Sequence, residues 1–139
     1  MWQPHVALDV QRSNGHIVHK VKRHAIGHLP FSKSDLAFVR SALTNVPQSQ
    51  VGTASVAFQG FPFSRVPVAG KTGSAEVPGF QTYSWFAAMA PAYDPQYVVA
   101  CIVEQGGHGA TTAAPVVRKI LEGLFKLPAT PFSLGNVAD

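Results

Sequence analysis

The sequence has a single cysteine, few charged residues and no long apolar run. With Cys101 as the only thiol, an internal disulfide is excluded. Hydrophobic residues make up 46% of the chain and charged residues 13%, a composition too apolar for a disordered protein. No apolar run reaches the length of about eighteen residues that a membrane helix needs. The first residues, Met1-Trp2-Gln3-Pro4, also lack the charged-then-apolar order of a secretory signal. We therefore expect one folded domain, because 139 residues are enough to bury a core.

Metal-binding side chains are scattered rather than clustered. His24 and His28 are four residues apart, but a glycine and a proline close by disfavour a helix there. His16 and His19 would point to opposite faces of a strand. No cysteine or carboxylate cluster joins these histidines, so we expect no metal and no cofactor. His108 lies among glycines and is expected to be an exposed loop residue.

The net charge of +4 comes from the beginning of the chain. Residues 1–33 contain Arg12, Lys20, Lys22, Arg23 and Lys33 against a single acidic residue, Asp9. Apolar residues separate these cations and no nucleic-acid-binding motif is present, so we expect a solvated face and no nucleic-acid partner.

The N-terminal part predicts a hairpin followed by a helix. In the hairpin region, residues 1–30, two apolar stretches at 5–10 and 16–21 flank the turn signal Ser13-Asn14-Gly15. Ser32 with Asp35 resembles a helix start, and apolar residues recur at helical spacing as far as Val46. We predict a helix over 32–46 that ends at Pro47.

Three consecutive strands are expected within residues 66–104, at 66–77, 83–90 and 97–104. The links between them are short and rich in turn residues, which predicts an antiparallel three-stranded meander. The last strand is continuously apolar from Val98 to Val103, so we expect it to be covered on both faces and Cys101 to be a buried thiol.

A second helix is expected over 112–127, with Pro115 in its first turn. Its apolar residues form one stripe that can pack on the sheet, and Arg118 and Lys119 lie off that stripe. Two prolines then end the helix, and residues 128–139 are expected to form a tail. The predicted fold class is α+β, an antiparallel sheet with helices packed on it.

The stretch 66–77, with the sequence Val-Pro-Val-Ala-Gly-Lys-Thr-Gly-Ser-Ala-Glu-Val, carries the chemistry. On a strand, Thr72 and Ser74 lie on one face and Lys71 and Gly73 on the other. Hydroxyls, one cation and exposed backbone N–H groups suit an anionic or carbonyl-bearing ligand that adds along the strand edge.

The sequence of this stretch allows two other interpretations. A phosphate-binding loop needs a glycine five residues before Gly70, where Arg65 stands, and a helix after Thr72, where Gly73 and Pro78-Gly79 follow. A purely structural strand with a solvent-reaching lysine is the other alternative.

Lys71-Thr72-Gly73 is also one motif of the penicillin-interacting serine enzymes. Its surroundings, residues 67–77, resemble the third motif of class B penicillin-binding proteins. Three further blocks follow in the family's order: Tyr83-Ser84-Trp85-Phe86 with Ala90-Pro91, Tyr97-Val98-Val99-Ala100 with Gln105-Gly106-Gly107, and 113–121. The resemblance covers residues 50–122 closely and 1–49 loosely. It implies the C-terminal portion of a β-lactamase/transpeptidase-like fold, with Gly60-Phe61-Pro62-Phe63 as a surface connection.

Two motifs of the resembled family are absent. No serine has a lysine three residues later, and none has an asparagine two residues later, so neither Ser-x-x-Lys nor Ser-x-Asn occurs. The chain therefore resembles the part of a transpeptidase domain that follows these motifs. The family's membrane anchor would also lie upstream, and the resemblance implies action on the extracytoplasmic face of the bacterial cell membrane.

The resemblance assigns roles to four residues. The Ser74 backbone N–H would donate one oxyanion-hole hydrogen bond, and the Thr72 and Ser74 hydroxyls would bind the substrate's terminal carboxylate beside Gly73. Lys71 would supply positive potential. The implied reaction is cross-linking of peptidoglycan stem peptides through the D-Ala-D-Ala amide, with β-lactams as mimics.

Two alternatives to the transpeptidase remain open on the sequence. One is a serine β-lactamase or β-lactam sensor, and the other is a non-catalytic module. Alone, the chain is expected to be inactive. It would leave the sheet face opposite the second helix uncovered, so we expect the N-terminal part of the same domain, a complementing chain or a homo-oligomer as partner.

Overall fold

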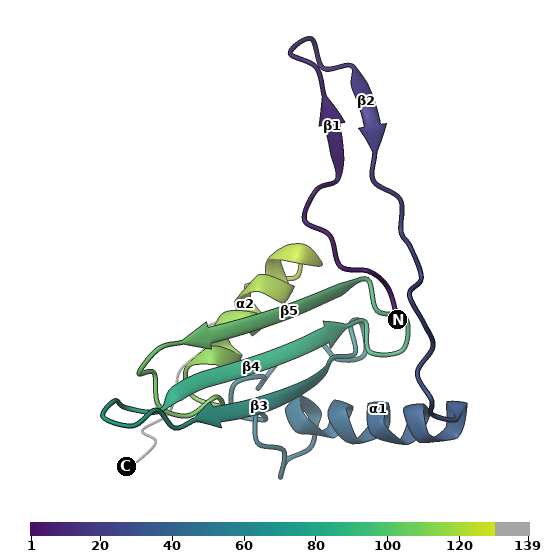
Figure 1. Cartoon of the computed structure of the whole chain (residues 1–139). Coiled ribbons are helices and arrows are strands. Elements are labelled where there is room, and N and C mark those ends of the chain that lie inside the picture. The colour runs from purple at the N-terminus through teal and green to yellow at the C-terminus, as the bar shows by residue number, and fades with distance from the viewer. Residues whose placement is uncertain (130–139) are drawn as a thin grey trace. The chain divides into compact units, whose positions relative to one another are not determined.

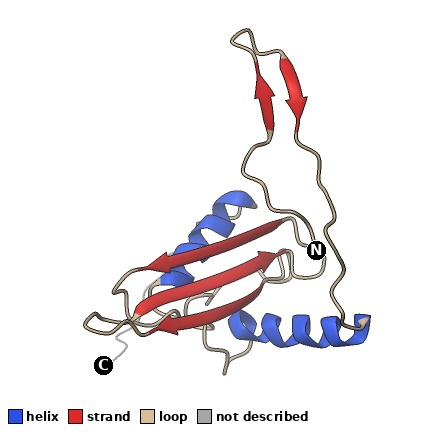
Figure 2. Ribbon diagram, viewed as in Figure 1, coloured by secondary structure: helices blue, strands red, loops and turns tan. Residues whose placement is uncertain are grey.

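The computed structural model describes residues 1–129, which contain five strands and two helices (Figures 1 and 2). In chain order these are β1 (Asp9–Gln11), β2 (Ile17–Lys20), α1 (Lys33–Gln48), β3 (Ala69–Ala75), β4 (Tyr83–Ala90), β5 (Tyr97–Val103) and α2 (Ala113–Leu124). The chain separates into two compact units, Met1–Lys33 and the part from Ser34 onward.

The first unit, called the arm below, is an antiparallel hairpin of β1 and β2. Gly15 turns the chain with φ +81, a conformation that a side chain disfavours, which explains the turn signal read from the sequence. At the base of the arm, Trp2 bridges to Ala25, and the Gln3 N–H donates to the His24 carbonyl at 2.8 Å. No residue of the arm is buried.

The second unit is built on a sheet with the order β3-β4-β5, in which both pairs are antiparallel. The meander thus has the predicted topology, and β4 has the predicted bounds. β3 is shorter than the predicted 66–77 because its lead-in already turns into the core: Val66 and Val68 are buried, and the Pro67 carbonyl accepts from the Ala92 N–H at 2.7 Å.

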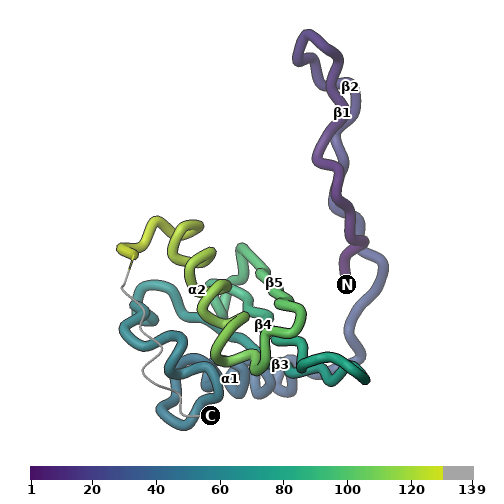
Figure 3. Tube along the Cα trace, turned by 90° about the vertical axis from the view of Figure 1, so that its left-hand side faces the viewer, coloured from purple at the N-terminus to yellow at the C-terminus, as the bar shows by residue number. Residues whose placement is uncertain are grey.

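Helix α2 covers one face of this sheet and contacts β4 and β5 (Figure 3). Alternate residues of β4 point toward it, since Ser84, Phe86, Ala88 and Ala90 are all buried. On α2, the residues that pack in this interface are Ala113, Ala114, Val117 and Leu121. This layer of helix on sheet confirms the predicted α+β class.

An aromatic cluster completes the core and corrects one expectation. Phe58 has ring centroids 5.4 Å from Phe61 and 5.7 Å from Phe86, and Phe61 lies 5.2 Å from Phe63. The prediction that Gly60-Phe61-Pro62-Phe63 is a surface connection is therefore wrong. The segment passes close enough to β4 for its rings to join Phe86, and Phe61 is only 5% exposed.

The face of the sheet away from α2 is open, as expected for this chain alone, and this contradicts the separate expectation that the last strand is covered on both faces. Val98 of β5 is 76% exposed and Ile102 is 44% exposed, while Val99 and Cys101 pack against the core. A second layer exists on one side only, so an apolar run does not ensure two-sided burial. Cys101 is accordingly half-buried rather than buried.

Arg118 is buried, although the helical pattern placed it off the apolar stripe. Its side chain is fully covered, and its Nε donates to Glu122 Oε1 at 2.9 Å while its Nη1 donates to the Ala57 carbonyl at 2.9 Å. The loop that carries Ala57 covers this side of α2, and pairing with Glu122 compensates the buried charge.

Helix α1 extends two residues past its predicted end. Pro47 lies inside the last turn and is buried. Proline removes its own N–H, but the Ser49 N–H still donates to the Asn45 carbonyl at 3.0 Å, so the helical turn continues past it.

The remaining expectations concern the surface and the end of the chain. His108 is exposed, as predicted. Of the expected tail 128–139, residues 130–139 lie outside the described residues.

Neither helix of the described part is long and apolar enough to cross a membrane. Across residues 1–129, no group of three or more His, Cys, Asp or Glu side chains is arranged to hold a metal ion.

Candidate active-site strand

Lys71, Thr72, Gly73 and Ser74 lie together on β3, one of the two edge strands of the sheet. Among the described residues, β3 pairs with β4 on one side and has no strand on the other. An edge strand presents unpaired backbone N–H and C=O groups. The predicted site residues are therefore on a strand whose backbone is open to a ligand.

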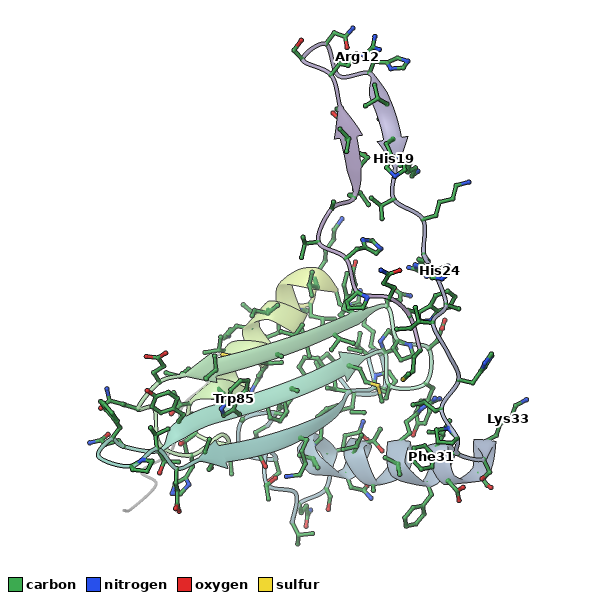
Figure 4. The ribbon with its side chains drawn as sticks, in the orientation of Figure 1. Arg12, His19, His24, Phe31, Lys33 and Trp85 are labelled. Carbon is green, nitrogen blue, oxygen red and sulfur yellow. The ribbon has the colours of Figure 1, made fainter. Side chains whose placement is uncertain are left out.

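The register confirms how the four residues divide between the two faces. Lys71 is opposite Ala87 and Gly73 is opposite Trp85, on the face away from α2. Thr72 and Ser74 are opposite Phe86 and Ser84, which point toward α2. Trp85, labelled in Figure 4, is 41% exposed, so the open face beside Gly73 has an aromatic surface.

Lys71 is exposed and its ammonium lies close to the strand backbone. The Nζ atom donates to the Thr72 carbonyl at 2.7 Å. Beside Lys71 is an apolar hollow of about 220 Å³ between Leu43 of α1 and the sheet. A larger hollow of about 510 Å³ lies near Phe58 and Phe61, and none of the four motif residues lines it. The motif is thus accessible.

Thr72 is oriented by a residue that the sequence analysis did not single out. Its hydroxyl oxygen lies 2.9 Å from the hydroxyl oxygen of Thr53, in the loop between α1 and β3. Thr53 is nineteen positions earlier in the chain. No local pattern connects two hydroxyls at that separation, so only the folded chain reveals the pair.

The loop before α2 packs directly on the backbone of the motif strand. A Cβ on Gly109 would come within 2.2 Å of the Trp85 carbonyl oxygen and 2.6 Å of the Gly73 carbonyl oxygen. Such distances exclude any side chain, so glycine is required for this close approach. Gly109 thereby fixes the position of β3 at Gly73.

Ser84 of β4 forms hydrogen bonds with the loop before α2 and with the first turn of α2. Its hydroxyl donates to the His108 carbonyl at 3.0 Å and accepts from the Ala113 N–H at 3.0 Å. The helix has no capping bond from its own Thr112 side chain, so a strand residue satisfies one of its first N–H groups. The sequence pattern places Ser84 on a strand but does not indicate this role.

Arg118 supports the loop that holds Thr53. By donating to the Ala57 carbonyl, its guanidinium connects α2 to residues 53–58. Lys119 adds a second cation near Glu122, with Nζ 3.1 Å from Oε2. The motif strand is thus supported from two sides, by the Gly109 loop and by the Thr53 loop.

A cation, two hydroxyls and backbone amides along one strand edge match the needs of an anionic or carbonyl-bearing ligand. Acyl transfer also requires a nucleophile and a base. The Ser-x-x-Lys pattern that would supply them does not occur in the 139 residues. The site has the binding and polarising groups of such chemistry without that nucleophile motif.

Comparison with protein families and known proteins finds that this chain is similar to transpeptidases. A family model described as the penicillin binding protein transpeptidase domain matches residues 1–122. The peptidoglycan D,D-transpeptidase MrdA of Salmonella typhimurium is 32% identical over 102 residues, which cover 63% of this chain and 16% of that protein. A peptidoglycan D,D-transpeptidase FtsI homolog of Mesostigma viride is 34% identical over 125 residues, which cover 82% of this chain and 20% of that protein.

A solved structure has the same fold. The D,D-transpeptidase domain of a peptidoglycan glycosyltransferase from Eggerthella lenta superposes with a TM-score of 0.63 and 34% identity, covering 86% of this chain and 27% of that one. The chain therefore spans 16% and 20% of the length of these two curated relatives and 27% of that solved chain.

Proposed function

The chain belongs to the penicillin-binding protein transpeptidase family, and from that membership we propose that it forms the Lys-Thr-Gly wall of the active site of a peptidoglycan D,D-transpeptidase. The observation that supports this most directly is the open edge strand β3, which carries Lys71, Thr72, Gly73 and Ser74 in succession, with Lys71 and Ser74 exposed. The reaction joins stem peptides on the extracytoplasmic side of the membrane. β-Lactams are the inhibitors that imitate the D-Ala-D-Ala end.

Each motif residue has a separate task in this proposal. The Ser74 backbone N–H donates to the oxyanion that forms when the D-Ala-D-Ala carbonyl is attacked. The Thr72 and Ser74 hydroxyls bind the terminal carboxylate. Lys71 supplies positive potential, which is worth most where a neighbouring chain excludes water.

Thr53 acts as a positioning residue in the same proposal. Its hydroxyl, 2.9 Å from that of Thr72, limits the rotation of the Thr72 hydroxyl and directs it toward the carboxylate. A fixed hydroxyl binds an anion with a smaller loss of rotamer freedom than a free one.

The attacking serine comes from outside these 139 residues, since they contain no Ser-x-x-Lys. Incubation of this chain alone with a fluorescent penicillin should therefore give no covalent band on a denaturing gel. A stoichiometric band would overturn the proposal, because the nucleophile would then lie within the chain.

The roles of the motif residues are tested in a protein that carries them together with Ser-x-x-Lys and Ser-x-Asn. There, Lys71→Ala should slow acylation by roughly 10²–10³-fold, the typical cost of losing one polarising group. Thr72→Val should also slow it, Thr53→Val should slow it less, and Thr53→Ser should restore the parent rate.

Lys33→Ala is the matched control, since Lys33 has the same charge, is exposed and lies outside β3. Its acylation rate should equal the parent rate. Acylation of Lys71→Ala at the parent rate would contradict the assigned role.

A serine β-lactamase uses the same type of strand, and its acyl-enzyme hydrolyses rapidly. Burst kinetics with a chromogenic cephalosporin distinguish the two activities. A burst followed by negligible turnover supports the transpeptidase, whereas sustained turnover favours the β-lactamase.

A further inference from the structure

The whole formal net charge of the chain is located on the arm. Residues 1–33 carry five of the eleven Lys and Arg residues and only one of the seven acidic residues, which leaves six of each after residue 33. Five of the six histidines are also in the arm: His5, His16, His19, His24 and His28. In Figure 4, Arg12 lies at the tip of the hairpin, with His19 and His24 along the returning chain.

These cations are not neutralised within the arm. Among the described residues, Arg12, Lys20, Lys22 and Arg23 take part in no ion pair. The one acidic residue, Asp9, accepts a hydrogen bond from Gln11 Nε2 at 2.9 Å. The positive potential of the arm is therefore available to a partner.

Large apolar side chains are exposed between the cations. They include Trp2, Val6, Leu8, Val10, Ile17, Val18, Ile26, Leu29 and Phe31. Val6 is fully exposed and Leu8 is 71% exposed. A two-stranded hairpin without a covered face is only marginally stable in water, so a partner that covers it gains hydrophobic contact as well as charge.

Both edges of the hairpin are open, and they differ in charge. Among the described residues, β1 and β2 pair only with each other. The β1 edge carries Asp9 and Gln11, whereas the chain of β2 and its continuation, residues 17–23, reads Ile-Val-His-Lys-Val-Lys-Arg. An acidic strand would be repelled from β1 and attracted to β2.

The open edges also decide against insertion into lipid. Unpaired backbone groups of a sheet edge are not tolerated in a hydrocarbon layer, where water cannot satisfy them. The tip of the hairpin is polar as well, with Arg12, Ser13, Asn14 and His16 around the turn. A polypeptide strand can satisfy the edge, because its own N–H and C=O groups complete the ladder.

We propose that the β2 edge of the arm, residues 17–23, binds an extended acidic segment of a partner protein by β-strand addition. The segment alternates apolar residues with Asp or Glu. Its backbone pairs with β2, its carboxylates lie on the face that carries Lys20 and Lys22, and its apolar side chains lie on the opposite face, which carries Ile17. This inference is independent of the proposed transpeptidase role.

The test uses the full 139-residue chain and a short fluorescein-labelled peptide in which valine and glutamate alternate. Fluorescence anisotropy should show saturable binding that weakens as salt is added, and amide signals of residues 17–23 should shift in NMR spectra. The matched peptide with lysine in place of glutamate should not bind. An N-methylated acidic peptide, which keeps the charge but blocks the backbone ladder, should also fail.

Lys22→Glu should weaken binding by about fivefold, the upper end for one exposed charge pair. Arg65→Glu changes the net charge equally in the other unit and should leave affinity within about twofold, since it lies outside the arm.

Three results would overturn the proposal. Equal binding of the N-methylated peptide would mean charge attraction without strand addition. Tight binding to phosphatidylglycerol vesicles or duplex DNA without peptide binding would assign the arm to a different class of partner. Protection of β2 amides from hydrogen exchange in a longer protein without peptide would mean that its own chain occupies the edge.

Discussion

The chain contains two β-structures, the β1–β2 hairpin and the β3–β5 sheet, and they differ in whether a second layer covers them. The sheet has α2 on one face, and Phe86 and Val117 between them are completely buried. The hairpin has strand-forming valine and isoleucine residues too, yet Val10 and Ile17 remain about half-exposed. Strand propensity forms a ladder, but only a second layer removes its apolar side chains from water.

Coverage by a second layer also distinguishes a buried charged residue from exposed ones. Arg118 of the covered unit is buried with Glu122 as partner, whereas the cations of the arm point into solvent. The buried charge of Arg118 is therefore structural, whereas the exposed charges of the arm are available for binding.

Removing the buried charge should have the largest effect on stability. Arg118→Ala leaves Glu122 buried with only part of its compensation and should lower the free energy of unfolding by about 3–5 kcal/mol. Arg12→Ala, on the exposed arm, should change it by less than about 0.5 kcal/mol. Urea unfolding followed by tryptophan fluorescence measures both.

The pair itself is tested by removing both partners. Arg118→Met together with Glu122→Leu should recover most of the lost stability, because no buried charge is left unpaired. If Arg118→Ala alone costs as little as Arg12→Ala, the buried ion pair is not structural.

Substituting one glycine in each unit compares the sheet and the hairpin by a smaller loss of stability. Gly109→Ala places a methyl group against the backbone of Gly73 and Trp85, and overpacking of this kind should cost about 1–3 kcal/mol. Gly15→Ala meets no atom within 4 Å, and its cost of about 1 kcal/mol comes from its positive φ alone.

Amide hydrogen exchange locates the two effects. Gly109→Ala should speed exchange across β3 and β4, while Gly15→Ala should affect the arm only. Equal loss of protection in the sheet from both variants would contradict the separation into two units.

The smallest expected effect concerns the serine that caps α2. Ser84→Ala removes the hydrogen bond to the Ala113 N–H and should cost about 1 kcal/mol, the typical value for a helix cap. Ser13→Ala in the exposed turn of the arm is the control and should be close to neutral. Unchanged exchange at the first turn of α2 in Ser84→Ala would show that the cap is dispensable.

Most strands of the covered unit could be predicted because their signals are local. Tyr83–Ala90 was bounded correctly by turn residues on either side, and the turn at Gly15 was recognised from Ser13-Asn14-Gly15. The motif at Lys71–Ser74 could be placed on a strand with the correct faces, because the period of a strand is two. The roles of its residues stay a proposal.

Features that depend on distant segments could not be predicted. The hydroxyl pair of Thr53 and Thr72, the burial of Arg118 by the Ala57 loop, and the position of Phe61 in the core each join residues far apart in the chain. Burial of β5 on both faces was also predicted wrongly, since an apolar run does not reveal how many layers will cover it.

By itself, the sequence determined the order of the elements, the family motif on its strand and the basic character of the arm. These follow from composition, period and turn chemistry, all of which act between neighbouring residues. Only the tertiary structure decided which face of the sheet is covered, which charge is buried and which edges stay open. Those outcomes depend on contacts between segments that the chain brings together only when it folds.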